Sequence, residues 1–222
     1  MPCRKGARVA EHPSALAHQF DDLTQQSAAD TLGMWVFLLT EMMFFGGLFA
    51  GYTVYRTLYP AAFAEGSHHL NLVLGGINTA VLISSSLTMA LAVHAAQTGQ
   101  RQLLLGFLLG TMVLGLVFLG IKAVEYAHKF AEHLVPGPGF VSAGPHAGQV
   151  QLFFGLYFGM TGMHALHMVI GIALLAGLAV LAWRGRFTPA YHAPVELIGL
   201  YWHFVDIVWI FLFPLLYLLG RA

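Results

Sequence analysis

The sequence predicts an all-α integral membrane protein, a bundle of five transmembrane helices. Of its 222 residues 58% are hydrophobic and only 9% are charged, and the mean hydropathy is +0.71. A soluble domain carries roughly 25% charged residues. The chain also contains five apolar stretches of the length, about 20 residues, that a helix needs to cross the hydrocarbon core of a bilayer. These observations exclude a large soluble enzymatic domain.

A polar segment precedes the first predicted helix. Residues 1–30 mix acidic and basic side chains and lack the apolar core of a signal peptide. Cys3, the single cysteine of the chain, lies in this segment, so an intrachain disulfide framework is excluded. The next stretch contains one charged residue, Glu41, and predicts a transmembrane helix over about residues 31–55.

Four further apolar stretches complete the predicted transmembrane domain, residues 31–222. They predict helices over about 71–94, 103–124, 151–183 and 195–219. Arg101 and the turn at Pro189 each separate two of these helices, and the loop 135–148 is rich in proline and glycine. Such residues end helices. The chain therefore crosses the membrane five times, with its termini on opposite sides.

The basic residues favour a cytoplasmic N-terminus. In that orientation six Lys and Arg residues lie on the cytoplasmic side and four on the other side, as the positive-inside rule requires. Ten basic residues balance ten acidic ones and the pI is about 7.2. No basic surface is therefore available for a nucleic-acid partner.

Small residues and histidines indicate which helix faces have protein neighbours. Glycines at helix-contact spacing predict close helix packing; they are Gly47, Gly51, Gly106, Gly110, Gly155, Gly159 and Gly162. On the helix 151–183, His164 and His167 point roughly away from the glycines. Imidazoles facing lipid would leave polar nitrogens unsatisfied. Either the bundle itself or a partner chain must therefore cover this face.

Glu41 is the first candidate for function, because it lies near the middle of its predicted helix. An ionisable residue at this depth is a functional candidate by default, and an unpaired carboxyl there is expected to be protonated. A role toward protons or lipid and a purely structural hydrogen bond are equally consistent with its position.

Two further polar groups lie within predicted helices. Asp206 is expected to pair with His203, one turn away, either as a clasp between helices or as part of a path for protons or ions. Lys122, Glu125 and Lys129 have the three- and four-residue spacing of an interfacial salt-bridge ladder that anchors its helix.

The residues do not predict an active site, a metal site or a haem on this chain. His164 and His167 share one helix three residues apart, so they cannot be the two axial ligands of one haem. His68 and His69 are too weak a signal for a metal site, and their role stays open. Motifs for phosphate binding and for a nucleophilic serine are also missing.

Three stretches resemble subunit III of haem-copper terminal oxidases, the cytochrome c oxidase subunit 3 family. Leu32–Tyr52 reads LGMWVFLLTEMMFFGGLFAGY, Thr161–Gly171 reads TGMHALHMVIG, and Tyr201–Phe211 reads YWHFVDIVWIF. Glu125 and Tyr126 match an E-Y pair at the end of a helix. The resemblance covers almost the whole predicted transmembrane domain, in the family's order.

The resemblance implies a non-catalytic accessory subunit that packs on the catalytic subunit I, with subunit II nearby, in a complex that reduces dioxygen to water. Haem and copper are expected in those partner subunits and no cofactor on this chain. Family members support proton uptake, hold membrane lipids and protect the catalytic centre during turnover. Glu41 would be the family's intramembrane acid, and His164, His167, His203 and Asp206 its buried polar residues.

Longer family members have seven helices, so this chain is similar to a five-helix form from a bacterial cytoplasmic membrane. The helix 31–55 and the E-Y pair favour cytochrome c as the electron donor of the complex, and the same role in a quinol oxidase or beside a nitric oxide reductase is an alternative. Two hypotheses of other classes are a membrane cytochrome and an independent transporter or proton channel that uses Glu41, Asp206 and the histidines. Purification of this chain without any oxidase subunit would favour one of these two hypotheses over the accessory-subunit interpretation.

Overall fold

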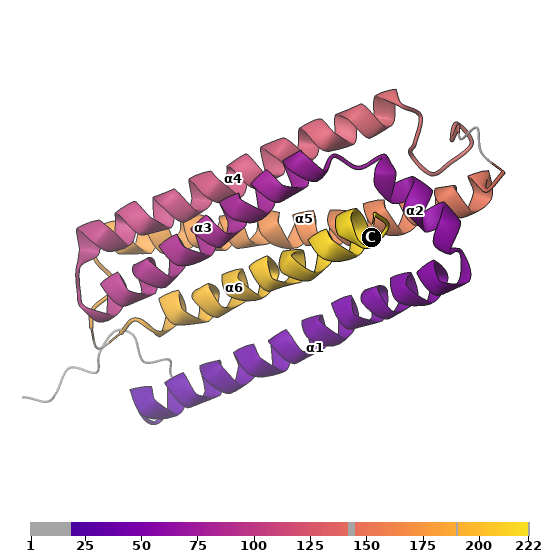
Figure 1. Ribbon diagram of the computed structural model, residues 1–222. Helices are drawn as coiled ribbons and strands as arrows, with labels where there is room; N and C mark the ends of the chain where they lie inside the picture. Colours follow the sequence, from indigo (N-terminus) through magenta and orange to yellow (C-terminus); the bar gives the residue numbers. More distant parts are fainter. Residues whose placement is uncertain (1–18, 142–144, 190, 222) are drawn as a thin grey trace, which may run out of the picture.

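The computed structural model describes residues 19–141, 145–189 and 191–221, and within them the chain is a bundle of helices without a β-strand (Figure 1). The elements are α1 (Leu23–Leu58), α2 (Pro60–His68), α3 (Leu72–Gln97), α4 (Arg101–Ala131), α5 (Ala147–Trp183), α6 (Ala193–Phe213) and the π-helical turn η1 (Pro214–Leu218). Among the described residues, five helices, counting η1 with α6, are long and apolar enough to cross a membrane, which confirms the predicted fold class. The cytoplasmic N-terminus stays a prediction, and Cys3 lies outside the described residues.

Helix α1 begins at Leu23, inside the segment that the sequence assigned to the polar N-terminus. Asp22 Oδ1 accepts a hydrogen bond from the backbone N–H of Gln25 at 2.7 Å, which caps the first turn. The helix continues for 36 residues, or about 54 Å at 1.5 Å per residue. It is therefore longer than the hydrocarbon core, which is about 30 Å thick.

The short helix α2 was not predicted, because its segment is neither long nor apolar enough to span a membrane. Pro60 occupies its first turn, where a missing backbone N–H costs little. Phe63 is buried against Phe153 of α5, with 5.5 Å between ring centroids. Gly66 allows this approach, because a Cβ there would collide with the Phe153 ring.

Helices α3, α4, α5 and α6 lie side by side, and α1 runs along α6 and α5 at one edge (Figure 1). Trp202 and Trp209 of α6 are fully buried in the core. The Trp202 ring fills recesses at Gly115 and Gly171, where an added Cβ would lie only 2.8 and 2.9 Å from it. Its indole Nε1 donates to Ser85 Oγ at 2.9 Å. Helix α6 is thus the most deeply buried of the five long helices that the structure describes.

The glycines that were predicted to lie at close contacts between helices do not lie at such contacts. An added Cβ would meet nothing within 4 Å at Gly47, Gly51, Gly106, Gly155 and Gly159, and would make only ordinary contact at Gly110 and Gly162. Close approach occurs instead where an aromatic ring needs a recess, as at Gly171. The spacing shows that small residues share a face, but it does not show that another helix covers that face.

Candidate functional site

A polar contact joins Glu41 of α1 to His167 of α5. Glu41 Oε2 lies 3.1 Å from His167 Nε2, and His167 Nδ1 lies 2.8 Å from the carbonyl oxygen of Met163. A carbonyl oxygen only accepts hydrogen bonds, so Nδ1 carries a proton. In the neutral ring Nε2 then has a lone pair, and a proton must lie between it and Oε2. The pair shares one proton, either as glutamic acid with imidazole or as carboxylate with imidazolium.

The bundle shields this pair only in part. The side chain of Glu41 is 21% exposed and that of His167 is 10% exposed. The Phe45 ring lies edge-on to the imidazole, with 5.2 Å between centroids, and Tyr201 donates to the His167 carbonyl oxygen at 3.0 Å. Glu41 is therefore not an unpaired acid. Because either proton arrangement leaves the pair without net charge, it can stay at membrane depth.

His164 has a different environment, although it lies on the same helix. Its ring is buried between Phe118 and Trp209, 5.4 Å from each centroid. Neither ring nitrogen has a hydrogen-bond partner within the described chain. The two histidines thus obtain non-lipid neighbours from the bundle itself, His167 from α1 and His164 from α4 and α6.

The predicted pair of Asp206 and His203 was wrong. His203 Nδ1 lies 2.6 Å from Ser86 Oγ of α3, and neither oxygen of Asp206 has a hydrogen-bond partner among the residues that the structure describes. The prediction considered donors on α6 alone. Residues three apart lie about 60° apart around a helix, and that rotation brings the imidazole to the serine of the neighbouring helix.

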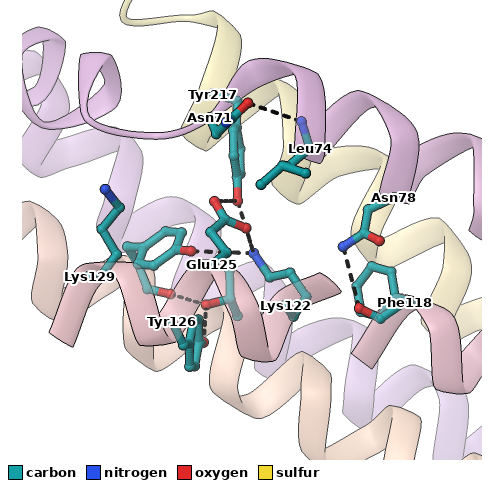
Figure 2. Close-up of polar contacts among 12 residues, drawn as sticks. Asn71, Leu74, Asn78, Phe118, Lys122, Glu125, Tyr126, Lys129 and Tyr217 are labelled. Atoms are coloured by element: carbon teal, nitrogen blue, oxygen red, sulfur yellow. Dashed lines mark hydrogen bonds and ion pairs between the residues drawn. The ribbon is translucent and has the colours of Figure 1, made fainter. Parts of the chain in front are cut away.

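Lys122 and Glu125 of α4 form a buried ion pair (Figure 2). Lys122 Nζ lies 2.8 Å from Glu125 Oε2, and the side chains are 6% and 2% exposed. Tyr217 of η1 donates to Glu125 Oε1 at 2.6 Å, while Lys122 donates to the hydroxyls of Tyr217 and Tyr157 at 2.9 and 3.3 Å. The Trp209 ring faces the ammonium at 4.9 Å. These partners compensate the buried charges and join α4, α5 and η1.

Lys129 does not continue this pair into the predicted ladder. Its Nζ lies 2.5 Å from Glu132 Oε2 and donates to the carbonyl oxygen of His69 at 2.7 Å. Glu125 instead turns inward, toward Lys122 and Tyr217. The Lys122–Glu125 half of the predicted ladder is confirmed. Its second half was wrong, because Lys129 pairs with Glu132 and connects α4 to the end of α2.

The described residues contain no group of three or more His, Cys, Asp or Glu side chains that could hold a metal ion. His68 and His69 therefore gain no third ligand within that part of the chain. The expectation that this chain carries no cofactor and no active site stays a prediction.

The match to known proteins covers almost the entire chain. A family model described as cytochrome c oxidase subunit III matches residues 22–221. The chain belongs to the cytochrome c oxidase subunit III family. Membership confirms the resemblance seen in the sequence, and it makes the chain an integral membrane protein and an accessory subunit of a terminal oxidase complex.

Relatives within the subunit III family are named for two kinds of oxidase. Cytochrome c oxidase subunit 3 of Synechocystis sp. is 37% identical over 191 residues, 84% of this chain and 74% of that protein. The protein of the same name from Thermostichus vulcanus is 36% identical over 194 residues, 86% of this chain and 87% of that protein. A probable quinol oxidase subunit 3 of Staphylococcus epidermidis is 31% identical over 210 residues, 93% of this chain and 96% of that protein.

Sequence reasoning about this subunit III chain missed two tyrosines, Tyr157 and Tyr217. Both are fully buried and both bond to Lys122. A signal was available, because a tyrosine within an apolar helix needs a partner for its hydroxyl. Because Lys122 lies far from both tyrosines in the sequence, the sequence alone does not identify it as their partner.

Proposed function

We propose that this chain is the non-catalytic subunit III of a respiratory haem-copper oxidase in a bacterial cytoplasmic membrane, with its N-terminus on the cytoplasmic side. It packs on the catalytic subunit I, with subunit II nearby, and those partners carry the haem and copper that reduce dioxygen to water. This chain supports proton uptake, the lipid environment and the endurance of the catalytic subunit. The family match over residues 22–221 supports this role.

The Glu41–His167 pair is the observation that carries the proton-related part of the proposal. The two side chains share one proton across 3.1 Å and are 21% and 10% exposed. The pair is therefore accessible from the outer face of α1, the helix that the bundle covers least, where a neighbouring subunit can contact it. Glu41 is accordingly the residue that we assign to proton handling next to subunit I.

An apolar groove between α1 and α6 supports the lipid-related part. It has a volume of about 460 Å³, and Trp35, Phe45, Phe204 and Phe211 are among the residues that line it. A lipid acyl chain fits such a groove, because it makes no hydrogen-bonding demand. Met42, which directly follows Glu41 in the sequence, also lines the groove.

The remaining polar candidates are assigned to assembly. They are Glu125, His164, His203 and Asp206, all buried or half-buried within the helix bundle. Polar groups that bond between helices hold transmembrane bundles together. Glu125 does this in the Lys122 network, and His203 does it through Ser86.

Cytochrome c is the proposed electron donor of the complex. The two relatives named above as cytochrome c oxidase subunits are 37% and 36% identical to this chain, against 31% for the quinol oxidase relative. The electron donor binds to other subunits, so oxygen consumption by the purified complex with reduced cytochrome c or with a quinol would test this point.

Purification through a tag on this chain in mild detergent, followed by a reduced-minus-oxidised optical spectrum, tests the proposal. We expect a haem-bearing large subunit to co-elute and the chain stripped from it to be colourless. A chain that elutes alone and colourless would contradict the proposal and favour a transporter. A chain that elutes alone with haem would make it a membrane cytochrome.

A further inference from the structure

A second groove lies between α3 and α6, with polar groups at its base. It has a volume of about 290 Å³, and Ser86, His203 and Asp206 line it together with apolar side chains. Of those apolar residues, Leu87 is 62% exposed and Ile207 is 51% exposed. The groove therefore opens on the outer face of the bundle, with an apolar rim and a polar base.

The carboxyl group of Asp206 is the unusual feature of this groove. The residue is only 3% exposed, and neither carboxyl oxygen has a hydrogen-bond partner in the described part of the chain. Ser86 lies beside it, with its hydroxyl 2.6 Å from His203 Nδ1. Even with that hydroxyl turned toward Asp206, one donor would serve one of the two oxygens. A buried carboxyl group without hydrogen-bond partners costs free energy whether it is ionised or protonated, and a further donor would relieve that cost.

The depth of Asp206 limits where that donor can come from. Asp206 is the fourteenth of 26 residues in the span Ala193–Leu218, and Ser86 is the fifteenth of 26 in Leu72–Gln97. Each is therefore about 16 Å or more from both ends of its helix. Lipid headgroups lie at those ends, and acyl chains carry no donor. A side chain on a neighbouring transmembrane helix can supply an N–H or O–H at this depth.

We propose that the groove between α3 and α6 is the docking site for a transmembrane helix of a neighbouring oxidase subunit, which inserts a hydrogen-bond donor side chain that bonds to Asp206. This inference rests on the proposed function, because that function supplies the neighbouring subunit. The exposed apolar rim, with Leu87 and Ile207, packs against the partner helix. The groove has about ten times the roughly 30 Å³ that a single water molecule occupies in the liquid, so it has room for a side chain.

Photo-crosslinking within the intact complex tests the location. A photoreactive amino acid replaces Leu87 at the rim or, as a matched control, Leu109 on the outer face of α4; the two native residues are 62% and 54% exposed. We expect position 87 to link to another oxidase subunit and position 109 to link to lipid. If the complex assembles but position 87 links to lipid alone or to a second copy of this chain, the docking site is overturned while the proposed function stands. If no oxidase subunit co-purifies, both fail.

Substitution of Asp206 tests the hydrogen bond. Asp206→Leu removes the acceptors at similar size, whereas Asp206→Asn keeps one carbonyl oxygen. We expect the Leu variant to retain the haem-bearing subunit about tenfold less well during a detergent wash, and the Asn variant to lie between Leu and the native chain. The isolated Leu variant should unfold at the same or a higher temperature, because it no longer buries an unsatisfied carboxyl. Full retention of the complex, or an isolated Leu variant that fails to fold, would overturn the proposal.

Discussion

Helices α1 and α6 contain equally apolar stretches but pack against the rest of the bundle to very different extents. Their most apolar windows have the same mean hydropathy, 1.7, yet 11% of that window is buried in α1 and 50% in α6. Hydropathy predicts that both helices cross the membrane. It does not predict whether their neighbours are lipid, other helices of this chain or another subunit.

The difference lies in the kind of contact each helix makes. Helix α6 inserts aromatic rings into recesses of its neighbours, as Trp202 does at Gly115 and Gly171. Helix α1 lies at one edge of the bundle. Besides ring contacts such as Phe45 with Phe204, 6.2 Å between centroids, it makes separate polar contacts: Glu41 to His167, and Tyr52, which donates to the Leu215 carbonyl oxygen at 2.8 Å. Substitutions around α6 should therefore damage the fold, whereas those on α1 should change its attachment and its function.

The largest effect is expected where η1, the continuation of α6, meets the buried ion pair. Glu125→Ala leaves the Lys122 ammonium buried without its carboxylate, which should cost about 3–5 kcal/mol of unfolding free energy. Denaturant unfolding in detergent measures this loss. A double variant, Lys122→Met with Glu125→Leu, removes both charges and should recover much of the stability. An unchanged unfolding midpoint for Glu125→Ala would show that the ion pair is not structural.

The packing of α6 can be tested with two glycines of α5. At Gly171 an added Cβ would lie 2.9 Å from the Trp202 ring, whereas at Gly177 it would meet nothing within 4 Å. Gly171→Ala should therefore lower the unfolding free energy by about 1–3 kcal/mol. Gly177→Ala is the control, and it should be neutral or slightly stabilising because alanine favours a helix. Equal effects at the two positions would contradict the central place of Trp202.

The attachment of α1 should respond to the loss of a single hydroxyl group. Tyr52→Phe removes the hydrogen bond to the Leu215 carbonyl oxygen and should cost about 1 kcal/mol. Thermal unfolding, together with the distance between spin labels on α1 and α6, measures the change. Tyr55→Phe alters an exposed tyrosine of the same helix and should change neither quantity. A loss as large for Tyr55→Phe would mean that the measured effect is not the hydrogen bond.

The smallest effect on stability is expected at Glu41. Glu41→Gln keeps the size of the side chain, and its amide can still donate to His167 Nε2, but no proton is shared. Assembly should therefore be retained while sustained turnover of the complex changes. Asp30→Asn removes an exposed acid from the same helix and serves as the control. Turnover endurance equal to that of the native complex would remove Glu41 from the proton-related role.

The sequence predicted the fold class because membrane insertion depends on properties that are local in the chain. Long stretches almost free of charge, broken at positions such as Arg101, were enough to predict five spans. The sequence did not predict which side chains meet, because that depends on how the helices are rotated and paired. Asp206 was assigned to its neighbour on the same helix, yet His203 bonds to Ser86 of α3. Glu41 was considered without a partner, and its partner lies 126 residues away.

The endurance of the purified complex with and without this chain tests the central claim most directly. The chain is removed by detergent from the complex that co-purifies with it, and oxygen consumption is followed through many turnovers. We expect the initial rate to be largely retained, activity to decay faster without the chain, and the purified chain to restore endurance when added back. Equal decay with and without the chain would contradict its role as a supporting subunit.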